Sequence, residues 1–334
     1  MDTTAEPVIT RVRAGTAVIE LDRPRALNAL DLTMVRLMTR ALEEWREDDA
    51  VRAVVVRSTS PKAFCAGGDI RAVREAGMRG DDTAVRAYFS AEYGLDGLIA
   101  RYPKPYIALI DGYAMGGGLG ISVHGSARVV TERASLAMPE TSIGFFPDIG
   151  ASWFLPRLPG AVGWYLGLTG VRIQAADAVD CGLATHYVPA AELPALEAAL
   201  TGEGPLADRG ADPAEALDRF ATPAPPSDLA GHREAIERCF TAPDLAGVRA
   251  RLAAEEADRE WARDTLAALD RGSPASLAIT FDLLRDGLAA DSVEECLARE
   301  LELASRVARS PDFHEGVRAV LVDKDRRPAW SSAG

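Results

Sequence analysis

Apolar and polar positions alternate in two different periods along the N-terminal part of the chain. Residues 8–21 carry β-branched residues at alternate positions on both sides of Ala14-Gly15, which predicts a hairpin of two short strands. From Leu30 to Trp45 the apolar positions recur at the i, i+3, i+4, i+7 spacing, which is typical of an amphipathic helix. Asp31 or Thr33 is positioned to cap the start of this helix.

Three short apolar runs predict buried strands. Residues 51–57, 106–110 and 127–131 are continuous apolar stretches bounded by polar residues, as expected for strands of a parallel sheet that are covered on both faces. Helical segments and Gly- or Pro-containing loops separate these runs. The first part of the chain is therefore assigned to the α/β class.

The composition changes near residue 205. Residues 202–228 are rich in Pro, Ala and acidic residues and lack strand-like runs, which indicates a partly helical connector. Beyond it, residues 245–269 and 292–309 follow a helical period, and Ser273-Pro274 is a typical helix start. We therefore expect a core domain over residues 1–204 and a mostly helical region over residues 205–334.

The charge and the cysteines restrict the protein class. The 334 residues include 37 Lys and Arg against 50 Asp and Glu, a formal charge of −13, which argues against nucleic acid as a partner. The four cysteines are far apart and form no C-x-x-C pair, and residues 1–7 lack the features of a secretory or transit peptide. Asp111 and several glycines interrupt the most apolar window, residues 106–123. We expect a cytoplasmic protein that does not enter membranes.

Several common sites are absent from the sequence. It has no P-loop, no H-E-x-x-H and no G-x-G-x-x-G after a strand, and its four histidines lack metal-ligand spacing. Gly120-Ile121-Ser122-Val123-His124 differs from a nucleophile elbow in its last residue, which predicts a structural role for His124. We therefore expect no metal site.

Two glycine-rich segments each follow a predicted strand and open a helix. They are residues 62–70, with Gly67-Gly68, and residues 111–118, with Gly116-Gly117-Gly118. Backbone N–H groups at helix starts have no partner within the helix, and two of them facing one point can bind a carbonyl oxygen that gains negative charge. Either segment alone is explained by close packing of helix on strand; together they favour an oxyanion site.

A third segment, residues 137–148, places Glu140 and Asp148 among Met, Phe, Gly and Pro residues. Burial in such surroundings raises the pKa of a carboxyl group, as suits a group that exchanges protons. The alternative is a pair of solvated loop acids.

Taken in order, these segments resemble the crotonase (enoyl-CoA hydratase/isomerase) superfamily. The resemblance rests on Leu21-Asp22-Arg23-Pro24 with Asn28-Ala29-Leu30, on residues 64–70, and on Gly116-Gly117-Gly118. It implies a spiral core of ββα units with a helical C-terminal region, an acyl-CoA substrate, and an oxyanion hole formed by the amides of Gly68 and Gly117.

Within the superfamily the chain is most similar to the 3-hydroxyisobutyryl-CoA hydrolase subfamily, through residues 120–125, 137–158 and 312–330. This resemblance assigns catalysis to Glu140 and Asp148 and substrate binding to Glu92. It assigns Arg71 and Lys324 to the phosphates of coenzyme A. Hydratases of the family carry an additional glutamate where this chain has Gly120, which argues against efficient hydration.

The expected reaction is hydrolysis of the thioester of 3-hydroxyisobutyryl-CoA in valine breakdown, either by direct attack of water or through an anhydride on Glu140. A hydratase or Δ-enoyl-CoA isomerase acting on another acyl-CoA is the first alternative, and a non-catalytic acyl-CoA binding protein is the second. No cofactor is expected apart from the coenzyme A of the substrate. The resemblance also implies a homo-oligomer.

Overall fold

The computed structural model describes residues 6–203 and 212–331. Contacts divide the chain into two compact units that are interleaved along the sequence. Unit 1 contains residues 1–68, 94–136 and 173–226, and unit 2 contains residues 69–93, 137–172 and 227–334. The predicted domain boundary between residues 204 and 205 lies outside the described residues.

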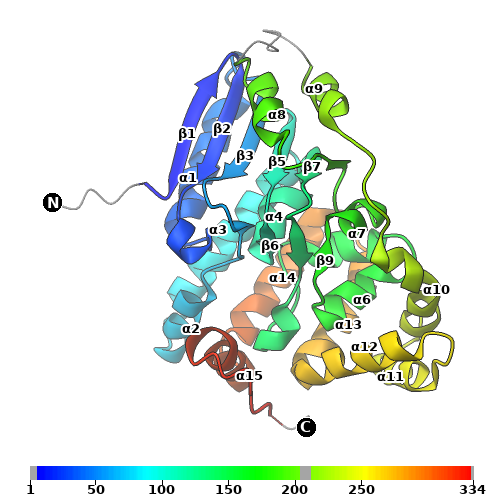
Figure 1. Ribbon diagram of the computed structural model, residues 1–334. Coiled ribbons are helices and arrows are strands. Elements are labelled where there is room, and N and C mark those ends of the chain that lie inside the picture. The colour runs from blue at the N-terminus through cyan, green and yellow to red at the C-terminus, as the bar shows by residue number, and fades with distance from the viewer. Residues whose placement is uncertain (1–5, 204–211, 332–334) are drawn as a thin grey trace. The chain divides into compact units, whose positions relative to one another are not determined.

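Unit 1 is built on a six-stranded sheet in the order β1-β2-β3-β5-β7-β10 (Figure 1). The predicted hairpin is confirmed: β1 pairs antiparallel with β2, from Val8 opposite Leu21 to Arg13 opposite Thr16, and every later pair is parallel. A second sheet has the order β4-β6-β8-β9. The strands are β1 (Val8–Arg13), β2 (Thr16–Leu21), β3 (Ala53–Ser58), β4 (Ala63–Cys65), β5 (Tyr106–Ile110), β6 (Tyr113–Met115), β7 (Ala127–Val130), β8 (Ser135–Ala137), β9 (Ile173–Gln174) and β10 (His186–Tyr187).

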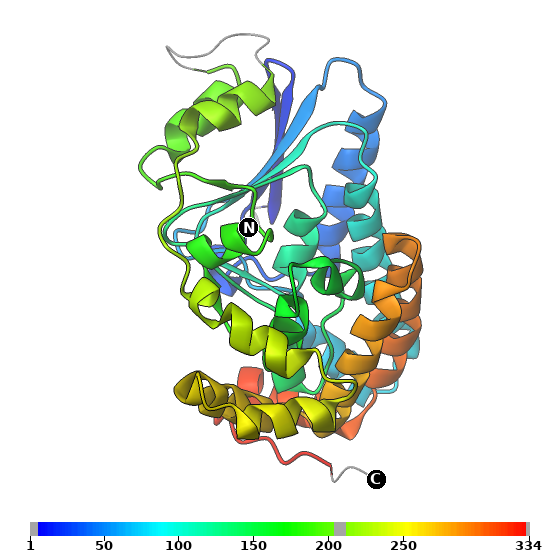
Figure 2. The ribbon, with the colours of Figure 1, turned by 90° about the vertical axis from the view of Figure 1, so that its right-hand side faces the viewer.

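Helices cover both faces of the larger sheet. Figure 2 shows the blue helix α1 on one side of the sheet and the green helices α8 and α9 on the other. Side chains of β2, β3, β5 and β7 pack with α8 and α9 in one buried apolar cluster. The helices of unit 1 are η1 (Pro24–Ala26), α1 (Leu32–Arg46), α4 (Gly117–Val123), α7 (Ala175–Asp180), α8 (Leu193–Leu200) and α9 (Pro213–Phe220). The predicted cap is confirmed, because the Asp31 carboxylate accepts a hydrogen bond from the Met34 amide at 2.9 Å.

Unit 2 is helical. The predicted starts at Ser273 and Ser292 are confirmed, since each serine hydroxyl accepts a hydrogen bond from an amide in the first turn of its helix. Helix α3 (Asp82–Ala100) begins in unit 2 and continues into unit 1. The other helices are α2 (Ile70–Met78), η2 (Glu140–Ile143), α5 (Ala151–Phe154), η3 (Leu155–Arg157), α6 (Val162–Thr169), α10 (Asp228–Phe240), α11 (Leu245–Ala254), α12 (Arg259–Arg271), α13 (Pro274–Leu288), α14 (Val293–Val307), α15 (Pro311–Val317) and the π-helical turn η4 (Arg318–Val322).

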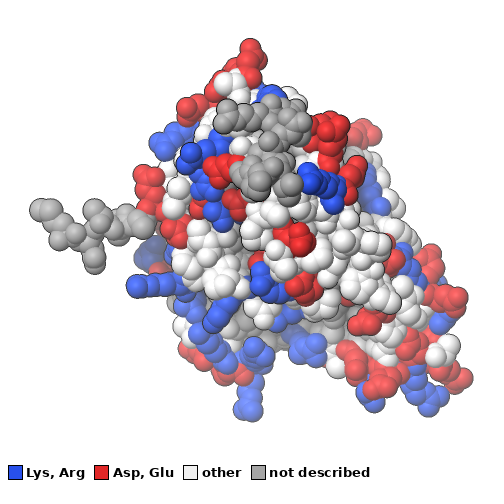
Figure 3. Space-filling view, turned by 45° about the horizontal axis from the view of Figure 1, so that its top comes forward, with Lys and Arg blue, Asp and Glu red and all other residues white. Residues whose placement is uncertain are grey.

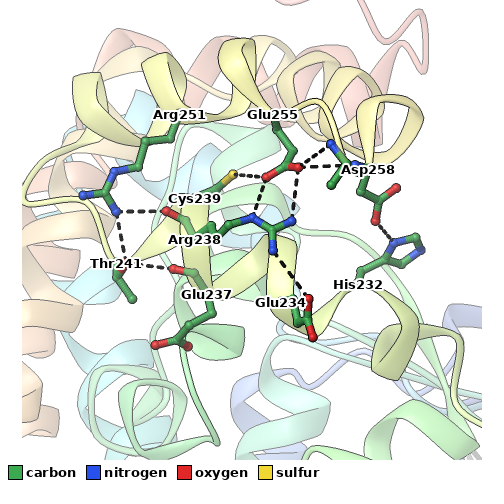
Figure 4. A network of polar contacts seen from close by, with 10 residues as sticks. His232, Glu234, Glu237, Arg238, Cys239, Thr241, Arg251, Glu255 and Asp258 are labelled. Atoms are coloured by element: carbon green, nitrogen blue, oxygen red, sulfur yellow. Dashed lines mark hydrogen bonds and ion pairs between the residues drawn. The ribbon is translucent and has the colours of Figure 1, made fainter.

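The helical period predicted over residues 245–269 corresponds to two helices, because four residues separate α11 from α12. The Glu255 carboxylate accepts hydrogen bonds from the amides of Ala257 and Asp258 at 2.9 and 3.3 Å, which fixes a turn in place of helix. Arg238 of α10 holds the same carboxylate through two hydrogen bonds at 3.0 and 3.1 Å (Figure 4). The turn therefore depends on a partner that is distant in the sequence.

The outer surface carries charges of both signs. On the face shown in Figure 3, basic side chains lie among acidic ones. Among the helices of the described residues, none combines the length and the hydropathy needed to cross a bilayer.

Candidate active site

The first glycine segment is held to the N-terminal part of unit 1 by Asn28. The buried side-chain NH₂ group of Asn28 donates to the Ser58 hydroxyl at 2.7 Å and to the Phe64 carbonyl at 3.0 Å. The side-chain oxygen of Asn28 accepts from the Arg23 amide at 2.8 Å. Backbone bonds from Ala66 to Leu27 and from Leu30 to Gly67 join the same two segments. The position of the Gly67-Gly68 loop is therefore fixed by the polypeptide around Asn28, the residue in the motif that carries the family resemblance.

The second glycine segment opens α4. Gly116 lies at φ +45°, in the region that favours glycine, and Gly117 is the first helical residue. The two segments approach closely, since a Cβ on Gly118 would lie 2.4 Å from the Cys65 carbonyl oxygen. A Cβ on Gly67, at φ +100°, would lie 3.0 Å from the Met115 carbonyl oxygen and 3.6 Å from the Gly117 nitrogen. Glycine is thus required on both sides of this contact.

Two amides of these glycine segments have no acceptor among the described residues. Within the part of the chain that the structure describes, neither Gly68 nor Gly117 donates a hydrogen bond from its amide. Gly117 is buried and Gly68 is half-buried. Free amides in such surroundings are suited to stabilise a developing oxyanion.

Glu140 lies in unit 2, at the start of the short helix η2. Its side chain is 7% exposed, and Oε2 is buried without a hydrogen-bond partner among the described residues. Burial, followed by the charge of Asp148, holds the pKa of Glu140 well above its usual range. The alternative of a solvated loop acid does not describe this residue.

Asp148 is also buried and is held by a tyrosine. Tyr93 of α3 donates a hydrogen bond from Oη to Asp148 Oδ2 at 2.6 Å. Burial raises the pKa of Asp148 to about 7, although the Tyr93 hydrogen bond lowers it. Asp148 can therefore change its charge near neutral pH.

Glu92 is the third buried carboxylate. It lies on α3 with 2% exposure and accepts a hydrogen bond from the Tyr88 hydroxyl at 3.3 Å. Burial, and then the charge of Asp148, raise the pKa of Glu92 well above its usual range. Unit 2 therefore brings the three predicted carboxylates, Glu92, Glu140 and Asp148, into one interacting cluster.

Aromatic rings pack along the segments that carry these carboxylates. Phe145 stacks on Phe89 with the ring centres 5.5 Å apart and on Phe146 at 4.5 Å. Phe313 of α15 lies 5.5 Å from Phe145, and Phe89 lies 5.7 Å from Tyr93. Burial of the carboxylates is the main physical cause of their raised pKa values.

Reasoning from the sequence missed Tyr93 and Glu300. Glu300 of α14 is fully buried, and its carboxylate accepts hydrogen bonds from the Gly150 amide and from the amide and hydroxyl of Ser152. Burial raises the pKa of Glu300 to about 8. No local pattern identifies either residue, because their partners are 55 and about 150 positions away in the sequence.

The two predicted cations lie in unit 2 and are exposed. Arg71 of α2 donates a hydrogen bond to the Leu321 carbonyl in η4, three residues before Lys324. Arg71 is thus linked to the segment that carries Lys324, although no contact tests a role in binding phosphate.

The described residues contain no group of three or more His, Cys, Asp or Glu side chains arranged to hold a metal ion. His232 bonds to Asp258, with Nδ1 and Oδ2 2.5 Å apart (Figure 4). The His232 ring stacks on Trp261. The absence of a cofactor stays a prediction.

Comparison with known proteins identifies the family. A family profile described as enoyl-CoA hydratase/isomerase matches residues 16–334. The mitochondrial 3-hydroxyisobutyryl-CoA hydrolase of Xenopus tropicalis is 44% identical over 323 residues, covering 96% of this chain and 83% of that protein. Its Homo sapiens counterpart is 39% identical over 335 residues, covering 98% and 85%.

Two further relatives have other names. The small ribosomal subunit protein mS47 of Neurospora crassa is 39% identical over 323 residues, covering 92% of this chain and 63% of that protein. The crystal structure of a carnitinyl-CoA dehydratase from Mycobacterium thermoresistibile matches with a TM-score of 0.90 at 36% identity, covering 98% of this chain and 92% of that one.

The predicted cytoplasmic location is wrong, because it conflicts with these relatives, whose names place hydrolases of this sequence type in mitochondria. The prediction relied on the cysteines and on the composition of residues 1–7, and the four buried free thiols show only that the cysteines form no disulfide. Free thiols do not distinguish one reducing compartment from another.

The structural match confirms the expected α/β fold class, with a crotonase-like core and a helical C-terminal region. The profile covers most of the chain, and the hydrolases align with nearly all of it. The chain belongs to the enoyl-CoA hydratase/isomerase family.

Proposed function

We propose that this protein hydrolyses the thioester of 3-hydroxyisobutyryl-CoA, giving 3-hydroxyisobutyrate and coenzyme A, as a step in valine breakdown. The names of relatives with 39% and 44% identity support this substrate and reaction. The observation that carries the chemistry is Glu140, whose buried carboxylate has one oxygen without a partner among the described residues.

The proposed reaction begins with polarisation of the thioester carbonyl. The amides of Gly68 and Gly117 donate to its oxygen, which carries the negative charge once the carbonyl carbon becomes tetrahedral. That both amides lack another acceptor among the described residues supports this role.

Glu140 supplies the attack by one of two routes. It accepts a proton from water as the water oxygen bonds to the carbonyl carbon, and the C–S bond then breaks as the proton passes to the departing sulfur. Alternatively its carboxylate bonds to the carbonyl carbon, coenzyme A leaves, and water cleaves the resulting anhydride. Both routes need Glu140 in its ionised form.

The other residues bind and orient the substrate. We assign Asp148 to the substrate hydroxyl or the attacking water, Glu92 to the acyl group, and Arg71 and Lys324 to the phosphates of coenzyme A. Gly120 contributes no carboxylate, so the chain lacks the second acid–base group with which the family's hydratases add water to a double bond. The reaction needs no cofactor, and self-association remains a prediction from the family resemblance.

Two other functions have support of their own. The solved carnitinyl-CoA dehydratase favours reactions that keep the thioester intact, and the ribosomal relative favours a protein without turnover. The three differ in their products: a hydrolase releases a free thiol, a hydratase or isomerase changes the acyl group of an intact thioester, and a binding protein does neither.

The test follows free thiol from 3-hydroxyisobutyryl-CoA and, in parallel, the loss of the double bond of crotonyl-CoA. We expect the wild type to release thiol and Glu140→Gln to be slower by about 10²- to 10⁴-fold, the usual effect of losing an acid–base group. The matched control is Asp177→Asn, since Asp177 is a buried carboxylate that accepts from the Gln174 amide in unit 1. Conversion of crotonyl-CoA without thiol release would replace the proposal by a hydratase, and binding without conversion by a non-catalytic protein.

A further inference from the structure

Glu300 is a buried acid whose hydrogen-bond partners among the described residues are amides and a hydroxyl. It lies on α14 with 0% exposure, and both of its carboxylate oxygens accept hydrogen bonds. Oε2 accepts from the Gly150 amide at 2.7 Å, and Oε1 accepts from the Ser152 amide at 3.0 Å and the Ser152 hydroxyl at 2.5 Å. All three donors belong to the short segment that follows Asp148.

This segment has an unfavourable backbone. Ile149 and Gly150 are both left-handed, at φ +60° and +79°. A β-branched residue such as isoleucine rarely adopts this conformation, so surrounding contacts must hold it. The Asp148 carbonyl closes the turn by accepting from the Ala151 amide at 2.9 Å.

Other helices of unit 2 restrict the same segment. Gly287 of α13 packs against Ser152 so closely that a Cβ there would lie 1.8 Å from the Ser152 carbonyl oxygen. Tyr93 of α3 fixes the Asp148 side chain by the 2.6 Å hydrogen bond. Glu300 thus holds the backbone next to Asp148, and Tyr93 holds the Asp148 carboxylate.

We propose that Glu300 is a positioning residue of the hydrolase, which holds the Asp148 carboxylate in its working place through the amides of Gly150 and Ser152. This inference rests on the proposed function, in which Asp148 orients the substrate hydroxyl or the water. Glu300 itself contacts the loop and not the reacting atoms.

The first test is a double-mutant cycle on kcat for thiol release. Glu300→Gln turns one carboxylate oxygen into an NH₂ group that faces a backbone N–H donor, so the loop must shift. We expect a fall of about 10-fold or more in kcat in the wild-type background, with KM changed less than kcat, and no more than about 2-fold in the Asp148→Asn background. Equal losses in both backgrounds would overturn the proposal, because a merely structural role does not depend on Asp148.

The second test does not need activity. Hydrogen exchange of the peptide over residues 148–153 should be faster in Glu300→Gln than in the wild type, and unchanged in Asp177→Asn, which removes a buried carboxylate from unit 1. Unchanged exchange in folded Glu300→Gln would also overturn the proposal. If the wild type released no thiol, the proposed function would fail, and with it the role of Glu300 in hydrolysis, while the exchange result would still decide whether Glu300 holds the loop.

Discussion

Replacement of Tyr93 by phenylalanine removes one hydrogen bond and keeps the ring. The lost bond is the 2.6 Å contact from Tyr93 Oη to Asp148 Oδ2, while the ring contact with Phe89 is preserved. Because the ionised carboxylate is the form that this bond stabilises, its loss raises the pKa of Asp148. A hydrogen bond to a charged group contributes about 1.5–3 kcal/mol, which corresponds to about 1–2 pKa units.

The assay is thiol release as a function of pH. The Asp148 pKa is about 7 in the wild type, so we expect kcat/KM to rise through this region as Asp148 and the coupled carboxylates ionise. In Tyr93→Phe the acid limb should move upward by about 1–2 units, with a loss of roughly 5-fold or more at pH 7 and recovery near pH 9. Recovery at high pH distinguishes a shifted titration from damage to the fold.

Tyr102→Phe is the control, because Tyr102 donates to the Leu42 carbonyl at 2.8 Å in unit 1. Its acid limb should coincide with that of the wild type. An unchanged acid limb in folded Tyr93→Phe would refute the reasoning, since Asp148 would then not govern the pH dependence.

Three further predictions concern the charges and glycines of the two units. The free energy of unfolding, measured in urea titrations, should fall on the order of a few kcal/mol from about pH 5 to pH 9. The pKa values of Asp148 and Glu300 in the folded state, about 7 and about 8, exceed those in the unfolded state, so the stability that their protonated forms contribute is lost as the pH rises through these values. A constant or rising free energy of unfolding would contradict this. Succinyl-CoA should be hydrolysed at least about 100-fold more slowly than 3-hydroxyisobutyryl-CoA, because the terminal carboxylate of the succinyl group would cost several kcal/mol beside the buried carboxylates. Comparable kcat/KM values for the two substrates would refute this specificity. Gly118→Ala should lower the free energy of unfolding by about 1–3 kcal/mol, because the added methyl group clashes with the Cys65 carbonyl. Gly94→Ala, in open space on α3, should raise it by about 0.5–1 kcal/mol. The melting temperature should therefore fall in the first variant and rise in the second.

Local signals were sufficient for much of the fold. The Ala14-Gly15 turn, the Asp31 cap and the Ser273-Pro274 start are each encoded within a few residues, and the structure has a hairpin or a helix start at each of them. The gap between α11 and α12 depends on Arg238 bonding to Glu255, a pairing of residues 17 apart that no local periodicity records.

The site divides in the same way. The glycine segments could be located because a strand followed by a helix start leaves amides free, and Glu140 and Asp148 because apolar residues surround them in the sequence. Tyr93 and Glu300 could not be predicted, because each lies on a helix and its hydrogen-bond partner lies in a loop that is distant in the sequence.

The most direct test of hydrolysis is a mass measurement of the coenzyme A species formed when the wild-type protein is mixed with 3-hydroxyisobutyryl-CoA. We predict free coenzyme A and 3-hydroxyisobutyrate in equal amounts, with no dehydrated acyl-CoA. Accumulation of a dehydrated acyl-CoA with the thioester intact would contradict hydrolysis and indicate a dehydratase.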